Sequence, residues 1–146
     1  MLQNQGDQAR AETAFKKAIR SDPIEMEAYH RLGRLYIRQG KTEEGKKIME
    51  MFERVRAEEE QILHFRHVIK LYPGDLHGHY NLGVLYAGLG HYPAAIREYE
   101  ETLRIDPEDR GARNNLANIL LGGNRVKEAI RHYEIVAENN PTYARG

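Results

Sequence analysis

A regularly recurring pattern constrains this chain more than any other feature. Pro73, Pro107 and Pro141 are equally spaced, since 107 − 73 = 34 and 141 − 107 = 34, and the positions between them also correspond, among them Ala95 with Ala129. Repeats of 20 to 50 residues are typical of solenoids, in which each unit buries its apolar face against its neighbours. The sequence therefore predicts a stack of similar units around one continuous core.

Every unit is expected to be helical. Apolar residues recur at helical spacing, and Gly and Pro occur between the periodic segments. Asp75 and Asp109 stand where N-caps belong, and Pro93 suits a first turn. The expected helices are 7–21, 25–39, 42–71, 76–88, 93–105, 110–121 and 126–138. The predicted fold class is an all-α solenoid of helix-turn-helix repeats.

The third of these helices is expected to be unusually long. Pro23 and Pro73 are separated by more than one repeat, since 73 − 23 = 50, which is 16 more than 34. After Gly45, the segment up to Leu71 contains no Pro, Gly, Ser, Asn or Asp that would end a helix. One continuous helix over 42–71 is the natural interpretation, and it takes the place of a missing first helix.

The pattern of one unit resembles the tetratricopeptide repeat. It contains Asn81-Leu82-Gly83-Val84-Leu85-Tyr86, and then Gly90, Ala95, Tyr99 and Pro107. The resemblance implies one solenoid fragment over 1–146. We expect a partial repeat over 1–24, a repeat over 25–56 with a helix extension over 57–73, and repeats over 75–107 and 109–141. The resemblance also implies an interaction scaffold or adaptor that binds a peptide or protein segment on its concave face.

Composition excludes several other functions. Lys plus Arg and Asp plus Glu both number 22, so no overall field attracts the chain to nucleic acid. No apolar stretch approaches the roughly 18 residues of a membrane span. No phosphate-binding glycine loop, nucleophile elbow or metalloprotease motif is present, and the seven histidines lack the converging partners of a zinc site. We expect no enzyme activity, no cofactor and no metal. The protein is expected to be soluble, and its composition leaves its localisation open between cytoplasm and periplasm.

The first helix of each pair supplies the expected peptide-binding residues. Arg31, Arg34 and Arg38 fall on one helical face and would suit carboxylates or phosphate, so the partner is expected to be acidic. Asn81 and Asn115 occupy equivalent positions one repeat apart and resemble the asparagine ladder of the O-linked N-acetylglucosamine transferase superhelix, whose amides pair with a peptide backbone. The full expected set is His30, Arg31, Arg34, Arg38, His77, Tyr80, Asn81, Asn114, Asn115 and Asn118.

Self-association is the main alternative. The missing first helix leaves an apolar seam at Ile62, Phe65 and Ile69, and either a second copy of the chain or an N-terminal part of a longer parent chain would cover it. Because Met1 and Gly146 fall inside expected repeats, the chain is interpreted as a fragment. An accessory interaction domain of a larger enzyme is the third alternative.

Overall fold

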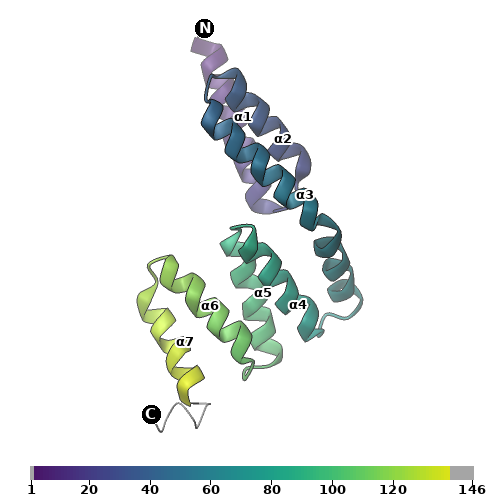
Figure 1. The fold of residues 1–146 in the computed structure, drawn as a ribbon, viewed down its shortest axis with the longest axis vertical. Helices are drawn as coiled ribbons and strands as arrows, with labels where there is room; N and C mark the ends of the chain where they lie inside the picture. Colours follow the sequence, from purple (N-terminus) through teal and green to yellow (C-terminus); the bar gives the residue numbers. More distant parts are fainter. Residues whose placement is uncertain (1, 139–146) are drawn as a thin grey trace. The chain divides into compact units, whose positions relative to one another are not determined.

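The computed structural model describes residues 2–138, and this part of the chain is helical, with seven helices and no strand (Figure 1). The helices are α1 (Leu2–Ser21), α2 (Met26–Arg38), α3 (Thr42–Leu71), α4 (Leu76–Gly88), α5 (Tyr92–Ile105), α6 (Arg110–Gly122) and α7 (Val126–Glu138). The predicted all-α repeat fold is confirmed. The chain forms two compact units, Met1–Gln61 and Ile62–Gly146, hereafter the N-terminal unit and the C-terminal unit.

The long helix is present as predicted. α3 runs over 30 residues from Thr42 to Leu71, and no residue inside it interrupts the backbone ladder. The division into repeats at the boundaries given above stays a prediction. Among the described residues, no helix is both long enough and apolar enough to cross a membrane.

Helix boundaries follow local chemistry. The side chain of Asp75 accepts a hydrogen bond from the Gly78 backbone N–H at 2.6 Å, and that of Asp109 accepts one from the Ala112 N–H at 2.8 Å. Both N-caps were predicted. α1 begins at Leu2 instead of the predicted Asp7, because one Gly at position 6 costs a helix only about 1 kcal/mol. The other boundaries differ from expectation by at most one residue.

The N-terminal unit packs α1 and the first part of α3 against α2. Tyr29 and Leu32 of α2 are each 1% exposed, and Val55 of α3 is fully buried. The Tyr36 hydroxyl donates to Glu12 on α1 at 2.8 Å. A Cβ at Gly33 would lie 2.8 Å from the sulfur of Met49, which shows how closely α2 and α3 approach.

The C-terminal unit stacks α4 against α5, α5 against α6 and α6 against α7 (Figure 1). The small residues Gly83, Ala95, Ala117 and Ala129 are all buried in this unit, and a Cβ at Gly83 would lie 2.6 Å from Tyr99 Cε1 of α5. The end of α3 joins this unit, since Arg66 Nε donates to the Tyr86 hydroxyl at 2.9 Å. α4 and α6 each bury one face in this packing, so only their remaining faces are open to partners.

Candidate functional site

A groove between α1 and α2 brings together the predicted basic residues. We call it the basic groove, and its cavity volume is about 700 Å³. Its lining comprises Asp7, Gln8, Ala11 and Phe15 of α1 with Glu27, His30, Arg31, Arg34, Leu35 and Arg38 of α2. The four residues predicted for peptide binding in this helix thus line one cavity. Apolar Ala11, Phe15 and Leu35 lie among the charged groups.

The arginines of the basic groove differ in their partners. Arg31 Nε lies 2.6 Å from Glu27 Oε1 in an ion pair between exposed side chains. Within residues 2–138, neither Arg34 nor Arg38 has a carboxylate within ion-pair distance, and both side chains are exposed. Three arginines face two carboxylates, Asp7 and Glu27, which leaves an excess of one positive charge. Arg34 and Arg38 are one helical turn apart and free to receive an anionic ligand.

Polar contacts hold the two walls of the basic groove in place. Glu12 on α1 accepts hydrogen bonds from Lys16 at 2.9 Å and from Tyr36 at 2.8 Å. These bonds lower the pKa of Glu12, with the Lys16 bond as the larger cause. Gln39 donates to Gln8 across the same interface at 3.2 Å. α1 and α2 are therefore fixed against each other by polar contacts as well as by apolar packing.

A second candidate surface lies on α4 and α6 in the C-terminal unit. We call it the amide face, and it comprises His77, Tyr80, Asn81, Asn114, Asn115 and Asn118. The Asn115 amide donates to the hydroxyls of Tyr80 at 3.3 Å and Tyr99 at 3.4 Å. The structure thus joins Tyr80 and Asn115, which the sequence placed in different repeats.

The other asparagines of the amide face are engaged differently. Asn81 Nδ2 donates to the His77 carbonyl one turn earlier in its own helix at 2.7 Å, and Asn118 accepts from the Tyr133 hydroxyl. Asn114 is exposed and lines a small cavity of about 450 Å³ together with Tyr133. The amides of Asn81 and Asn115 already donate within the chain, so a bound peptide would have to share or replace these bonds.

The predicted self-association residues lie in the second part of α3. Ile62 is fully buried, and Phe65 and Ile69 are half-buried. Ile69 contacts the start of α4, since a Cβ at Gly78 would lie 2.6 Å from its Cγ2. Larger exposed fractions occur at neighbouring positions, with Leu71 58% and Tyr72 66% exposed.

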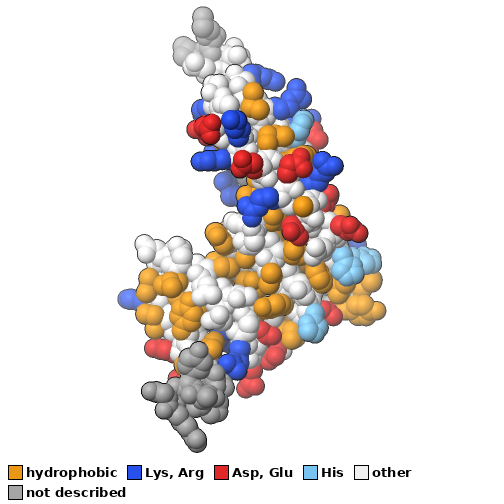
Figure 2. Space-filling model, viewed as in Figure 1, with side chains coloured by type: hydrophobic (Ala, Val, Ile, Leu, Met, Phe, Trp, Pro, Cys, Tyr) orange, Lys and Arg blue, Asp and Glu red, His pale blue; other side chains and the backbone are white. Residues whose placement is uncertain are grey.

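One cavity was not predicted from the sequence. It has a volume of about 460 Å³ and lies between the start of α5 and the end of α6. Its lining is mostly apolar and includes Tyr92, Pro93, Ile96, Ile119 and Gly122. Exposed Leu121, Val126 and Ile130 add to the hydrophobic surface over α6 and α7 that Figure 2 shows. The pair Gly122-Gly123 is the sequence feature that could have predicted this cavity, because two residues without side chains leave space beside their apolar neighbours.

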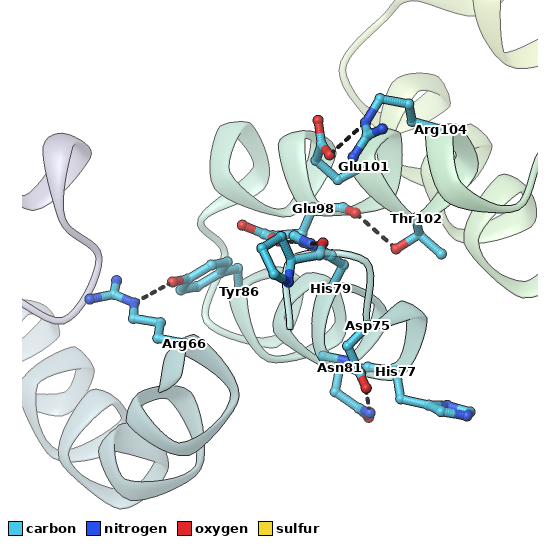
Figure 3. Close-up of polar contacts among 12 residues, drawn as sticks. Arg66, Asp75, His77, His79, Asn81, Tyr86, Glu98, Glu101, Thr102 and Arg104 are labelled. Atoms are coloured by element: carbon cyan, nitrogen blue, oxygen red, sulfur yellow. Dashed lines mark hydrogen bonds and ion pairs between the residues drawn. The ribbon is translucent and has the colours of Figure 1, made fainter. Parts of the chain in front are cut away.

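Polar contacts in the C-terminal unit centre on His79 of α4. Its ring lies between Glu98 of α5 and the turn before α4 (Figure 3). Within residues 2–138, no three His, Asp or Glu side chains are arranged to hold a metal ion.

Comparison with known proteins gives a consistent result. Profiles of the tetratricopeptide repeat match residues 1–25, 14–47 and 80–144, and no curated protein sequence matches the chain. The crystal structure of MamA is similar, with a TM-score of 0.55 and 23% identity over 99% of this chain and 95% of that chain. MamA from Desulfovibrio magneticus RS-1, solved from residue 41 to its end, has a TM-score of 0.50 and 22% identity over 94% and 69% of the two chains.

YrrB, described as a tetratricopeptide protein with an unusual peptide-binding site, has a TM-score of 0.51 and 18% identity over 96% of this chain and 81% of that chain. At these identities the structural likenesses show the fold. The profile matches, together with the repeat pattern, show the family. The chain belongs to the tetratricopeptide repeat family.

Proposed function

We propose that this chain is a protein-interaction scaffold without catalytic activity, and that its basic groove binds an acidic segment of a partner protein. The observation that carries the proposal is the pair Arg34 and Arg38, which line a cavity and have no carboxylate partner within residues 2–138. YrrB, which shares the fold, is described as having a peptide-binding site, and this supports a peptide as the ligand.

The lining of the basic groove indicates what the segment contains. Guanidinium groups bind carboxylates through paired N–H donors, and such charge-assisted bonds are stronger than neutral ones. Phe15 and Leu35 supply apolar surface within the same cavity, so a ligand with an apolar side chain between acidic residues would use both. Glu27 neutralises Arg31, which places the strongest attraction at Arg34 and Arg38.

Fluorescence anisotropy with a labelled peptide of Glu residues around one Phe tests the proposal. Replacing Arg34→Gln together with Arg38→Gln is expected to weaken binding about tenfold or more, since bonds to charged groups contribute about 1.5–3 kcal/mol each when well formed and less when exposed. Binding of the wild-type chain should also weaken as salt is added. The control pair Arg97→Gln and Arg131→Gln removes two exposed arginines outside the groove.

Equal loss of affinity in the control pair, or wild-type binding that does not respond to salt, would contradict the acidic segment. A wild-type chain that binds a Lys-rich peptide as well as the Glu-rich one would do so too.

We infer that the amide face contributes a second contact, in which Asn114 pairs with the backbone of a bound segment and Tyr80 offers a ring to its side chains. Asn114 is exposed, and an amide side chain provides both a donor and an acceptor. Replacing Asn114→Ala should weaken binding of the natural partner without changing the unfolding transition. Unchanged affinity for that partner would remove the amide face from the proposal.

Self-association is the second candidate, and the exposed apolar side chains near the end of α3 favour it. Leu63, Leu71 and Tyr72 are 48%, 58% and 66% exposed, and burying the exposed part of each would contribute roughly half of the about 1.5–3 kcal/mol that a fully exposed large apolar side chain gains. Sedimentation analysis should show an oligomer that dissociates in a Leu63→Glu, Leu71→Glu variant but persists in Val84→Glu, an exposed control in α4. A wild-type chain that sediments as a monomer at high concentration would refute this candidate.

A further inference from the structure

The ring of His79 faces two hydrogen-bond acceptors at once. Nδ1 lies 2.8 Å from Glu98 Oε2, and Nε2 lies 2.9 Å from the backbone carbonyl oxygen of Pro73 (Figure 3). A neutral imidazole carries one N–H and therefore donates to only one acceptor, whereas the imidazolium donates from both nitrogens. The geometry around His79 thus matches the charged ring.

The surroundings of His79 support the same protonation state. The residue is 8% exposed, and burial alone disfavours its charge. The bonds to Glu98 and to the Pro73 carbonyl, together with the nearby carboxylate of Glu101 on α5, outweigh burial and raise the pKa of His79. Glu101 itself pairs with Arg104 at 2.9 Å (Figure 3).

In the other repeats, the residue equivalent to His79 also donates a hydrogen bond to the carbonyl of the preceding proline, but from a different chemical group. We call this hydrogen bond the proline tie. Arg113 follows His79 by one repeat; it donates from Nη2 to the Pro107 carbonyl at 2.8 Å and places Nη1 3.1 Å from His132 Nδ1. Tyr29 precedes His79 by the same interval that separates Pro23 from Pro73, and its hydroxyl donates to the Pro23 carbonyl at 3.1 Å. A side chain of each first helix therefore holds the carbonyl of the proline before it.

Of these three tying side chains, only that of His79 ordinarily changes charge near neutral pH. A guanidinium has no neutral form in proteins, and burial raises the pKa of Tyr29 further above neutrality. The pKa of His132 is lowered by burial and then by the charge of Arg113, which favours the neutral ring whose Nδ1 can accept from that arginine. Of the three hydrogen bonds to a proline carbonyl, the bond from His79 to Pro73 is therefore the one that a change of pH near neutrality can break.

We propose that His79 is a pH-sensitive latch, which fastens the turn between α3 and α4 onto α4 and α5 when protonated and releases the Pro73 carbonyl when it loses its proton. After deprotonation, one N–H remains, and the carboxylate of Glu98 is the stronger acceptor for it. The lone pair of Nε2 then faces the Pro73 carbonyl oxygen, and the turn closed by the Asp75 N–H and the Tyr72 carbonyl at 2.9 Å loses its outer support.

The direction of the pH effect follows from the raised pKa. A histidine whose pKa is higher in the folded state stabilises that state fully below the unfolded value, near 6.5, and the stabilisation disappears as pH rises through the folded value. The turn should therefore be tightest in mildly acidic solution and loosen at alkaline pH. This inference goes beyond the proposed function and needs no ligand.

Hydrogen exchange of the backbone amides at Asp75 and His79 tests the latch, with rates corrected for the pH dependence of unstructured peptides. In the wild-type chain, protection should fall between pH 6 and pH 9 by about tenfold for each unit by which the folded pKa exceeds the unfolded one. His79→Arg places at this position the residue type that the next repeat has at Arg113. Because a guanidinium keeps its charge, the protection of these amides in this variant should not change with pH. His67→Gln, an exposed control on α3, should behave like the wild type.

A second measurement holds even if the arginine variant folds poorly. Nuclear magnetic resonance titration of the His79 ring should give a pKa above 6.5, and Glu98→Gln, which keeps an acceptor but removes the charge, should lower it. A ring that titrates at or below the ordinary value, or turn protection that falls equally in His79→Arg, overturns the latch.

Discussion

Replacing Gly83→Ala tests the packing that defines the C-terminal unit. A Cβ at this position would lie 2.6 Å from Tyr99 Cε1 and 2.8 Å from Cδ1. Tyr99 is 2% exposed and its hydroxyl receives the Asn115 amide, so the ring has little room to move. Overpacking of this kind typically costs about 1–3 kcal/mol, and the helical preference of Ala over Gly returns about 1 kcal/mol of it.

The assay compares Gly83→Ala with Gly88→Ala in the same helix, where an added Cβ meets no atom within 4 Å. Hydrogen exchange in α4 and α5 reports the stability of this unit separately, which matters because a chain with two compact units need not unfold in one step. The packing cost predicts that the Gly83 variant is about 5- to 150-fold less protected than the Gly88 variant. Equal protection in the two variants would refute the close approach of α4 and α5.

Two further predictions concern local polar contacts. Asp109→Ala should destabilise the first turn of α6 by about 1 kcal/mol, because the Ala112 N–H loses its side-chain acceptor; exchange of the Ala112 amide measures this, and Glu108→Ala, an exposed neighbour, should leave it unchanged. Glu12→Gln should destabilise the N-terminal unit at neutral pH, and the difference from wild type should shrink below pH 4.5. The lowered pKa of Glu12 means that its stabilising contribution is present above 4.5 and is lost as pH falls through the folded value. Denaturant unfolding at pH 7 and pH 3 measures the effect, and a difference that stays constant with pH contradicts it.

Periodicity and punctuation were sufficient to predict the helices. The long helix α3 followed from the lack of any residue between Gly45 and Leu71 that ends a helix. The N-caps Asp75 and Asp109 followed from their position before apolar-periodic segments. Such features depend on residues close in sequence, and a single sequence contains them directly.

Side-chain partners across helices were not available from the sequence. Asn115 was predicted to face a peptide, and the hydrogen bonds that its amide donates to Tyr80 and Tyr99 were not foreseen. The turn after α6 shows the same limit at the backbone, since Asn124, and not Gly122 or Gly123, has positive φ (68°). Asn tolerates positive φ better than other non-glycine residues. From the sequence alone, however, one of the two neighbouring glycines would be expected at the positive-φ position.

The basic groove could be predicted from the sequence in part. Helical spacing placed Arg31, Arg34 and Arg38 on one face, and all three line the same cavity. Their inequality was not foreseeable, because the ion pair between Arg31 and Glu27 depends on rotamers and not on spacing alone. Phe15 entered the lining from α1, which only the packing of two helices reveals.

The recurring tie to the proline carbonyl has a consequence for protein design. One position of the repeat is occupied by Tyr29, His79 and Arg113. Each contacts the carbonyl of the proline before its helix, through a phenol, an imidazole and a guanidinium respectively. A consensus array built by averaging the repeats of this chain would have to choose one of them. Choosing Arg at every position would give an array whose turns are indifferent to pH, whereas His at every position, each with a Glu opposite, would give one that softens along its whole length in alkali.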